Sequence, residues 1–214
     1  MVTRPPEELA IGLFRKALRR LSGGRYGHRR SSPRDRLLHA MPRGSVCAEI
    51  GVFAGDFSER ILHVVRPARL HLVDPWRYET EPEYSSAWYG GTKGGSQADM
   101  DAVYASVCRR FAPQVQAGTV AIHRASSVDE AAAFPDAYFD WVYVDGNHRY
   151  EFVKADLEGY ASKVKPGGLI AGDDYQVVGW WEDGVTRAVD EFIARSRCRV
   201  LSTAGNQFIL RRPG

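Results

Sequence analysis

The chain has 214 residues, is 44% hydrophobic and 26% charged, and carries a net charge of +3, which is ordinary for a globular protein and unlike a disordered one. No apolar run approaches the roughly 18 residues of a membrane span, and no signal-peptide pattern opens the chain, so we expect a cytoplasmic protein. Three widely spaced cysteines fit neither a disulfide framework nor a zinc cluster.

The positive charge is concentrated at the N-terminus. Residues 1–40 carry ten Lys or Arg and three Asp or Glu, a net charge of about +7, so the remainder carries about −4. Basic residues alternate with Leu and Phe at helical spacing between Leu13 and Leu21, and we interpret residues 1–40 as a basic helical arm. We favour docking of this arm on the same chain or on a twin subunit over binding to nucleic acid or acidic lipid.

From residue 46 onward, short apolar strands alternate with helices. The predicted strands are 46–50, 70–73, 119–123, 141–144 and 169–171, and the predicted helices are 57–65, 97–111 and 150–164. This alternation predicts an α/β fold whose mainly parallel sheet has helices on both faces. Segments 199–202 and 208–210 predict a closing hairpin that adds an antiparallel strand. We assign 41–214 to this domain, with a lid-like insertion at 76–118.

The first strand leads into a turn that predicts the cofactor. Glu49 lies at the strand end, and Gly51 and Gly55 stand in the turn before the next helix. In a doubly wound sheet, ligands bind beyond the carboxyl ends of the strands, where glycine permits close backbone approach. A dinucleotide site would have a glycine in place of Glu49 to seat a pyrophosphate. The charge of Glu49 instead suits the sulfonium and ammonium of S-adenosylmethionine (SAM), which disfavours a nicotinamide cofactor.

Further residues complete the predicted cofactor site. Asp74 ends the second strand, where a carboxylate can accept the ribose hydroxyl hydrogen bonds. Ser126 and Ser127 follow the third strand and are candidates for the adenine edge, although serines there also cap helices. Ser58, in the helix after the glycine turn, and Asp145 are the remaining cofactor-binding candidates.

Acids follow two strands that we expect to be neighbours. Asp145 closes the fourth strand, and Asp173 and Asp174 close the fifth. Neighbouring strands lie about 4.8 Å apart, so the three carboxylates would converge and would need a cation to neutralise them. Oxygen ligands without clustered Cys or His predict Mg²⁺ or Mn²⁺. Successive residues of a strand point to opposite faces, so Asp173 and Asp174 share an ion only if the strand has already ended.

An ion at these acids would activate a hydroxyl group for methyl transfer. A chelating cation lowers the pKa of a bound hydroxyl and aligns its oxygen with the methyl carbon. Removal of the proton then requires a base, for which His148 and Asp145 are the two candidates. We favour His148 as the base and Asp145 chiefly as an ion ligand.

Several motifs together resemble a known family. They are Glu49–Gly55, Asp74, Val144–His148, the segment Pro166–Tyr175 with its paired Asp173-Asp174, and the stretch 184–192. From about residue 44 to residue 192 the chain is similar to class I SAM-dependent methyltransferases, specifically metal-dependent sugar O-methyltransferases of the macrocin type. The resemblance implies a Rossmann-like, seven-stranded sheet.

The resemblance also implies roles for individual residues and a substrate class. The acids at Asp145, Asp173 and Asp174 would bind Mg²⁺, and Asp145 would also compete with His148 as the base. The chain is shorter than the macrolide-modifying members, so their substrate specificity does not carry over. Its size and its Arg- and Ala-rich composition are similar to those of mycobacterial sugar 1-O-methyltransferases of methylmannose polysaccharide synthesis, which implies a short mannoside acceptor.

Aromatic residues flank the proposed site and are candidates for substrate contact, because flat rings suit the apolar face of a sugar. The predicted substrate contacts are Trp76, Trp180, Trp181 and Tyr175. The alternatives are a natural-product deoxysugar, a catechol-like diol, or a nucleic-acid-directed methyltransferase that uses the basic arm. We expect a homodimer from the frequency of this state among enzymes.

Overall fold

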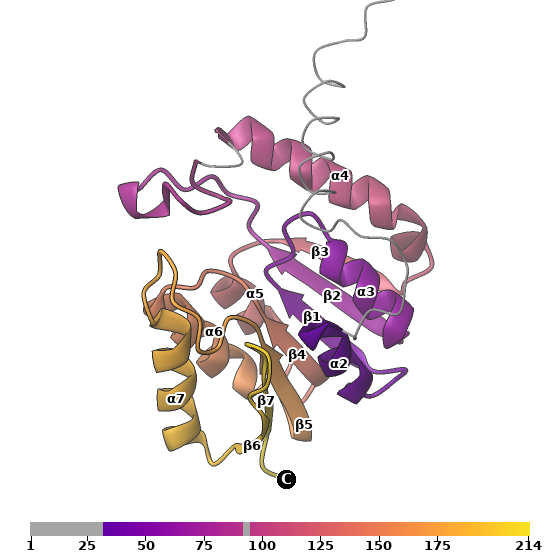
Figure 1. Cartoon of the computed structure of the whole chain (residues 1–214). Coiled ribbons are helices and arrows are strands. Elements are labelled where there is room, and N and C mark those ends of the chain that lie inside the picture. Colours follow the sequence, from indigo (N-terminus) through magenta and orange to yellow (C-terminus); the bar gives the residue numbers. More distant parts are fainter. Residues whose placement is uncertain (1–31, 92–94) are drawn as a thin grey trace, which may run out of the picture. The chain divides into compact units, whose positions relative to one another are not determined.

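The structure is a computed structural model that describes residues 32–91 and 95–214. Residues 33–214 form one compact unit, and most of the predicted basic arm lies outside the described residues. The strands are β1 (Val46–Ile50), β2 (Arg69–Asp74), β3 (Val120–Arg124), β4 (Phe139–Val144), β5 (Val164–Gly172), β6 (Arg199–Ser202) and β7 (Phe208–Arg211). The helices are α2 (Pro33–Ala40), α3 (Asp56–Val64), η1 (Pro82–Tyr84), α4 (Gln97–Gln116), α5 (Ser127–Ala133), α6 (Tyr150–Ala161) and α7 (Gly184–Ser196) (Figure 1).

The strands form one seven-stranded sheet in the order β3-β2-β1-β4-β5-β7-β6. The pairs from β3 to β5 are parallel, whereas β7 pairs antiparallel with both β5 and β6. This confirms the predicted mainly parallel sheet with an antiparallel C-terminal hairpin. The order reverses between β1 and β4, the position at which doubly wound sheets bind their ligands.

The register aligns the carboxyl ends of the central strands. Ile50 pairs with Val144, and Val144 pairs with Gly172, so β1, β4 and β5 end side by side. This confirms the prediction that the fourth and fifth strands are neighbours. Because parallel strands end at the same sheet edge, the residues that follow these three strands share one location.

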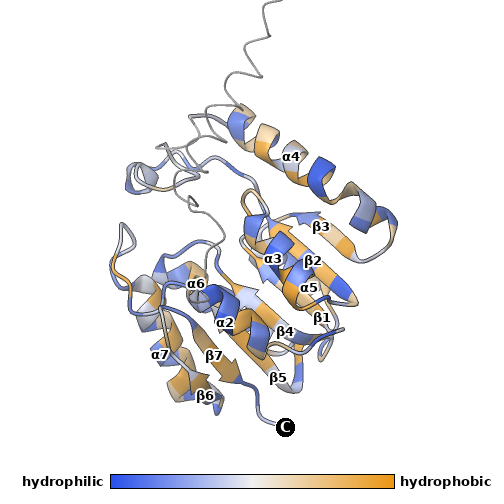
Figure 2. Cartoon of the chain, turned by 45° about the vertical axis from the view of Figure 1, so that its right-hand side comes forward, coloured by the Kyte–Doolittle hydropathy of each residue, from blue (hydrophilic) through white to orange (hydrophobic). Residues whose placement is uncertain are grey.

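Helices cover both faces of the sheet, and each face has its own apolar core. Helices α2, α3 and α4 pack on one face around residues such as Leu38, Ile61 and Phe111. Helices α5, α6 and α7 pack on the other face around residues such as Leu157 and Val189. Hydrophobic residues concentrate on the strands, and the helices carry both kinds of residue (Figure 2). Alternate residues of β1, β4, β5 and β7 serve the two cores, which is the signature of strands buried on both faces.

Two predicted elements differ from those observed. Strand β5 begins at Val164 rather than at residue 169, because Pro166-Gly167-Gly168 forms an irregularity within the strand instead of a turn before it. Helix α4 extends to Gln116 and buries Met100, Val107 and Phe111, so the second half of the predicted insertion covers the sheet. Within the described residues, no helix combines the length and apolar character that a membrane crossing needs.

A buried histidine pair links β2 and β3 beneath α5. His71 Nδ1 lies 2.9 Å from His123 Nε2, and His71 Nε2 lies 3.1 Å from the hydroxyl of Tyr138. His123 Nδ1 lies 2.7 Å from a carboxylate oxygen of Glu130. Burial, followed by the charges of His123 and Arg69, lowers the pKa of His71 to about 4. Burial also lowers the pKa of His123.

From the lowered pKa values of these two histidines we predict that the folded state loses stability in acid. In the unfolded chain a histidine binds its proton near a pH of about 6.5, so the unfolded state gains protons first and stability falls as the pH drops from about 6.5 toward 4. We expect the free energy of unfolding of His71→Phe to change less with pH over this range than that of the unmodified protein. Urea titrations at several pH values measure this, with the exposed His63→Gln as control. Equal pH slopes in all three proteins would contradict the expectation.

Candidate active site

The turn after β1 lies directly against the loop after β4. The amide of Asp145 donates a hydrogen bond of 2.8 Å to the carbonyl of Ile50. Gly51 has a φ of 90°, and a Cβ at this position would lie 2.1 Å from the Asp145 carbonyl oxygen. Only glycine combines this conformation with this approach. The glycine therefore serves the contact between two loops, which brings Asp145 to the turn predicted to bind the cofactor.

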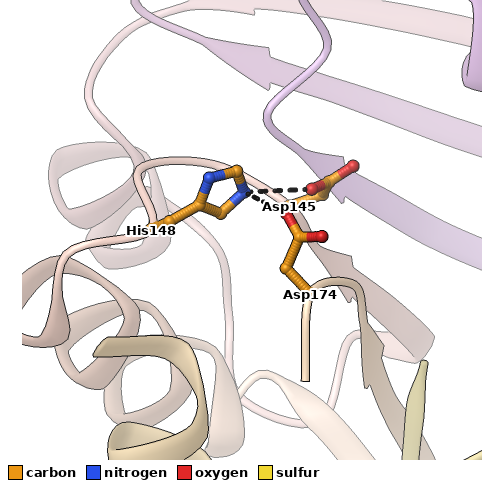
Figure 3. A group of neighbouring side chains, drawn as sticks. All are labelled: Asp145, His148 and Asp174. Atoms are coloured by element: carbon orange, nitrogen blue, oxygen red, sulfur yellow. Dashed lines mark hydrogen bonds and ion pairs between the residues drawn. The ribbon is translucent and has the colours of Figure 1, made fainter. Parts of the chain in front are cut away.

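Three titratable side chains meet beyond β4 and β5 (Figure 3). His148 Nε2 lies 3.3 Å from Asp145 Oδ1 and 3.3 Å from Asp174 Oδ2. One potential ligand atom of each residue lies within 4.8 Å of the other two. Although burial opposes it, the hydrogen bond and charge of Asp145 raise the pKa of His148. Burial, together with the charges of Asp173 and Asp145, raises the pKa of Asp174.

Asp173 does not join this cluster, although it precedes Asp174 directly. Strand β5 ends at Gly172, and Asp174 has a φ of 57°, so the chain has already turned as a shared ion requires. The carboxylate of Asp173 nevertheless faces Arg34 of α2, whose Nε donates a hydrogen bond of 2.6 Å. Arg34 Nη2 also lies 2.8 Å from Asp145 Oδ2. The structure thus brings Asp145 and Asp174 together with His148 and pairs Asp173 with an arginine.

Asp74 is buried at the end of β2 and accepts four hydrogen bonds from the chain. The amides of Val52, Phe53 and Trp76 donate to it at 2.9, 2.9 and 2.7 Å. The fourth donor is the hydroxyl of Tyr89, at 2.5 Å. Three of these donors reach Oδ2 and only the amide of Trp76 reaches Oδ1, so a ribose that hydrogen-bonds to both oxygens would need a donor to leave Oδ2.

Glu49 and Ser58 form a buried pair beneath the glycine turn. Ser58 Oγ donates a hydrogen bond of 2.5 Å to Glu49 Oε2, and both residues are almost fully buried. Burial, with smaller contributions from Asp145 and Asp74, raises the pKa of Glu49 to about 8. Ser58 therefore contacts Glu49 in this structure, and burial makes the carboxyl group harder to ionise than an exposed one.

The two predicted adenine-site serines have different surroundings. Ser126 caps α5 through a hydrogen bond of 3.2 Å from the amide of Asp129, and it lines a cavity of about 550 Å³ beside Pro75 and Arg124. This cavity lies beyond the ends of β2 and β3. Ser127 instead donates to the buried carboxylate of Asp156. Of the two, only Ser126 lines the cavity.

The aromatic candidates separate into two groups. The side chain of Trp76 is fully buried and its Nε1 donates a hydrogen bond of 2.8 Å to the carbonyl of Phe53, while the residue also lines the cavity beside Ser126. Tyr175 is buried and donates 2.8 Å to Asp190 of α7, which directs its hydroxyl to that helix. Trp180 and Trp181 are half-buried, and the Trp181 ring lies 4.5 Å from that of His148.

Sequence reasoning missed Arg34 and Tyr89. Arg34 is one of ten basic residues among positions 1–40, and no spacing distinguishes it from the others. Tyr89 stands in an aromatic-rich segment that gave only a general indication of a site rim. Both act on acids far away in the chain, so their partners follow from the fold and not from local pattern.

The fold and the site define a Rossmann-like class I methyltransferase. The model of the family described as "Methyltransferase domain" matches residues 48–175, more than half of the 214 residues. The chain belongs to this methyltransferase family, whose members and structural neighbours support the use of SAM.

Solved structures agree on the fold. TomG, an O-methyltransferase of Streptomyces achromogenes involved in tomaymycin synthesis and solved with SAM, has a TM-score of 0.59 at 18% identity over 100% of this chain and 92% of its own. A putative rRNA methylase of Clostridium thermocellum has a TM-score of 0.57 at 12% identity, covering 85% and 94%. An N1-methyltransferase of Burkholderia thailandensis acting on 1,6-didemethyltoxoflavin has a TM-score of 0.51 at 14% identity, covering 100% and 93%. A search of curated protein sequences gives no significant match.

Glu49 predicts pH-dependent binding of SAM. A cationic ligand near Glu49 favours its carboxylate, so below its pKa of about 8 binding releases a proton and strengthens as the pH rises. We expect the affinity for SAM to increase between pH 6 and pH 8, by up to about tenfold per pH unit. Isothermal titration calorimetry at each pH measures this, with Glu49→Gln as the variant that flattens the dependence. An unchanged slope in Glu49→Gln would assign the effect to another group.

We predict that the hydroxyl of Tyr89 competes with a ribose hydroxyl for the carboxylate of Asp74. Its hydroxyl occupies an acceptor position that a ribose hydroxyl would take. We expect Tyr89→Phe to bind S-adenosylhomocysteine several-fold more tightly, on the order of one hydrogen bond's net contribution. Calorimetric titration tests this, with Tyr78→Phe, a half-buried tyrosine of the same segment, as control. Weaker binding by Tyr89→Phe would show that the hydroxyl assists the ligand instead.

Proposed function

We propose that the protein is a divalent-cation-dependent O-methyltransferase that transfers the methyl group of SAM to a hydroxyl of a small carbohydrate. The observation that carries this proposal is the meeting of Asp145, His148 and Asp174 beside the aromatic pair Trp180 and Trp181. Acids and an imidazole next to flat rings combine the requirements for activating a hydroxyl and for holding a sugar.

The chemistry of the cluster suits a hard or borderline cation. Two carboxylates at one place raise each other's pKa and need positive charge nearby. Asp145 and Asp174 offer oxygen ligands of the kind that Mg²⁺ and Mn²⁺ prefer. When bound there, the ion would lower the pKa of a coordinated hydroxyl group.

The side chains themselves would position the acceptor and move its proton. Asp145 and Asp174 would hold the ion, and His148 would accept the hydroxyl proton as the C–O bond forms. The C–S bond of SAM breaks in the same step, and its electron pair stays on sulfur, which leaves neutral S-adenosylhomocysteine. His148 must be neutral for this role, and the positive charge of an ion held by Asp145 and Asp174 would favour that state.

The aromatic rim supports a carbohydrate acceptor. Trp180 and Trp181 lie edge to face with ring centroids 5.6 Å apart, and Tyr84 packs against Trp180 at 5.2 Å. The buried indole N–H of Trp181 has no acceptor among the described residues and would suit an acceptor oxygen. A short mannoside is our first choice, on the resemblance to sugar 1-O-methyltransferases. A deoxysugar or a catechol-like diol is the alternative small acceptor.

The substrate is tested directly by mass spectrometry. The protein is incubated with isotopically labelled SAM, Mg²⁺ or Mn²⁺, and a panel of mannosides, other saccharides, catechols and RNA. We expect a gain of one labelled methyl on a short saccharide and loss of transfer when EDTA removes the ion. Transfer that survives EDTA would exclude the ion from the reaction, and transfer only to catechols or RNA would exclude the carbohydrate.

His148→Gln tests the base. Without a base the hydroxyl retains its proton, so we expect kcat to fall by about 10²- to 10⁴-fold while SAM binding is unchanged. Steady-state kinetics and calorimetric titration with SAM measure the two effects separately. His63→Gln, an exposed histidine of α3, is the matched control. Near-normal turnover in His148→Gln would favour Asp145 as the base.

A further inference from the structure

The carboxylate of Asp173 accepts hydrogen bonds from other groups of the chain. Arg34 Nε donates to Oδ2 at 2.6 Å, and Arg34 Nη2 contacts the same oxygen. The amide of Asp174 donates 2.8 Å to Oδ1, which also accepts from the side-chain amide of Gln207. These four donors use all of the roughly four acceptor positions of a carboxylate. Asp173 is 8% exposed and therefore has little capacity left for an ion.

The two carboxylate oxygens of Asp145 have different partners, and Arg34 is one of them. Arg34 Nη2 holds Oδ2 at 2.8 Å, while Oδ1 faces His148 at 3.3 Å. The guanidinium lies over the ring of Phe57, 5.2 Å from its centroid, which fixes it from a further side. Asp145 Oδ1 is therefore directed toward His148 and Asp174, where the proposed ion would lie.

The charges of the site balance with Arg34 included. Asp145, Asp173 and Asp174 together carry three negative charges when ionised. One guanidinium and one divalent ion neutralise them, with His148 left neutral. A third carboxylate on the ion would instead leave the guanidinium without the carboxylate oxygen of Asp173 that both its Nε and its Nη2 contact.

We propose that Arg34 is a positioning residue that takes Asp173 out of the ion's ligand set and orients Asp145 Oδ1 toward the ion. This inference rests on the proposed metal dependence. It departs from the three-acid site that the sequence predicts, because the ion keeps Asp145 and Asp174 only. Arg34 lies outside residues 48–175, the part that the family model matches, so membership of the family does not assign it this role.

The first test compares single substitutions by Mn²⁺ binding to the full chain, measured by calorimetry and by the electron paramagnetic resonance signal of free Mn²⁺. We expect Asp174→Asn to weaken Mn²⁺ binding by about tenfold or more, as loss of a ligand does. Asp173→Asn should weaken it several-fold less than Asp174→Asn, because the charge of Asp173 is already paired with Arg34. A loss in Asp173→Asn as large as in Asp174→Asn would overturn the proposal.

The second test removes the guanidinium. Arg34→Met keeps an apolar stem and frees Asp173, so Asp173→Asn in that background should now weaken Mn²⁺ binding by about tenfold. Arg60→Met is the matched control, because Arg60 pairs with Asp35 between α3 and α2 without touching the site. Its Mn²⁺ affinity should equal that of the unmodified protein. Equal effects of Asp173→Asn in both backgrounds would overturn the coupling.

Two controls separate this inference from the proposed function. A thermal shift with S-adenosylhomocysteine reports whether each variant keeps its fold and cofactor site. Absence of Mn²⁺ binding in the unmodified protein would overturn the inference, whether or not labelled methyl transfer occurs. Methyl transfer to a saccharide that depends on the ion but responds equally to Asp173→Asn and Asp174→Asn would retain the proposed function and refute the role of Arg34.

Discussion

The alignment of three strand ends is the constraint on which the site depends. Because β1, β4 and β5 end in register, the residues that follow these strands lie at the same place on the sheet edge. Gly51 allows the turn after β1 to contact the loop after β4, since any side chain at this position would collide with the carbonyl of Asp145. The acid cluster and the glycine turn after β1 are thereby parts of one loop assembly.

Crowded acids explain the remaining features of the site. Burial raises the pKa of Glu49, Asp74, Asp173 and Asp174, so each acid needs donors or cations to remain in place. The chain supplies them from distant segments, with backbone amides and Tyr89 for Asp74 and a guanidinium for Asp173. Asp145 shares that guanidinium through Oδ2, while its Oδ1 faces His148, which Asp174 also contacts.

Methyltransferases that share this fold act on very different substrates, as the O-methyltransferase and N-methyltransferase neighbours of this chain illustrate. The loops beyond β4 and β5 and the insertion after β2 lie outside the common sheet and can differ between proteins that share it. In this protein those loops contribute Trp180, Trp181 and Tyr84. The identity of the acceptor is therefore a property of these loops and not of the fold.

The sequence by itself determined the fold class and the order of the strands along the chain, and it predicts where the site lies. Alternating apolar strands and helices have periodicities that are visible locally, and the acids at the strand ends must share one edge once the sheet is parallel. Trp76 shows the limit, because an aromatic in a loop has the same local pattern whether it contacts a ligand or packs in the core. Only the tertiary structure decided that it is buried.

The tertiary structure also decided which partner each acid of the site contacts. The sequence places Asp173 and Asp174 side by side and cannot distinguish them, since the turn that follows β5 sets their directions. Arg34 comes from a helix more than one hundred residues earlier in the chain, and its pairing with Asp173 depends on how α2 packs against the sheet. Local patterns report what a residue can do, whereas the packing of distant elements determines which partner it meets.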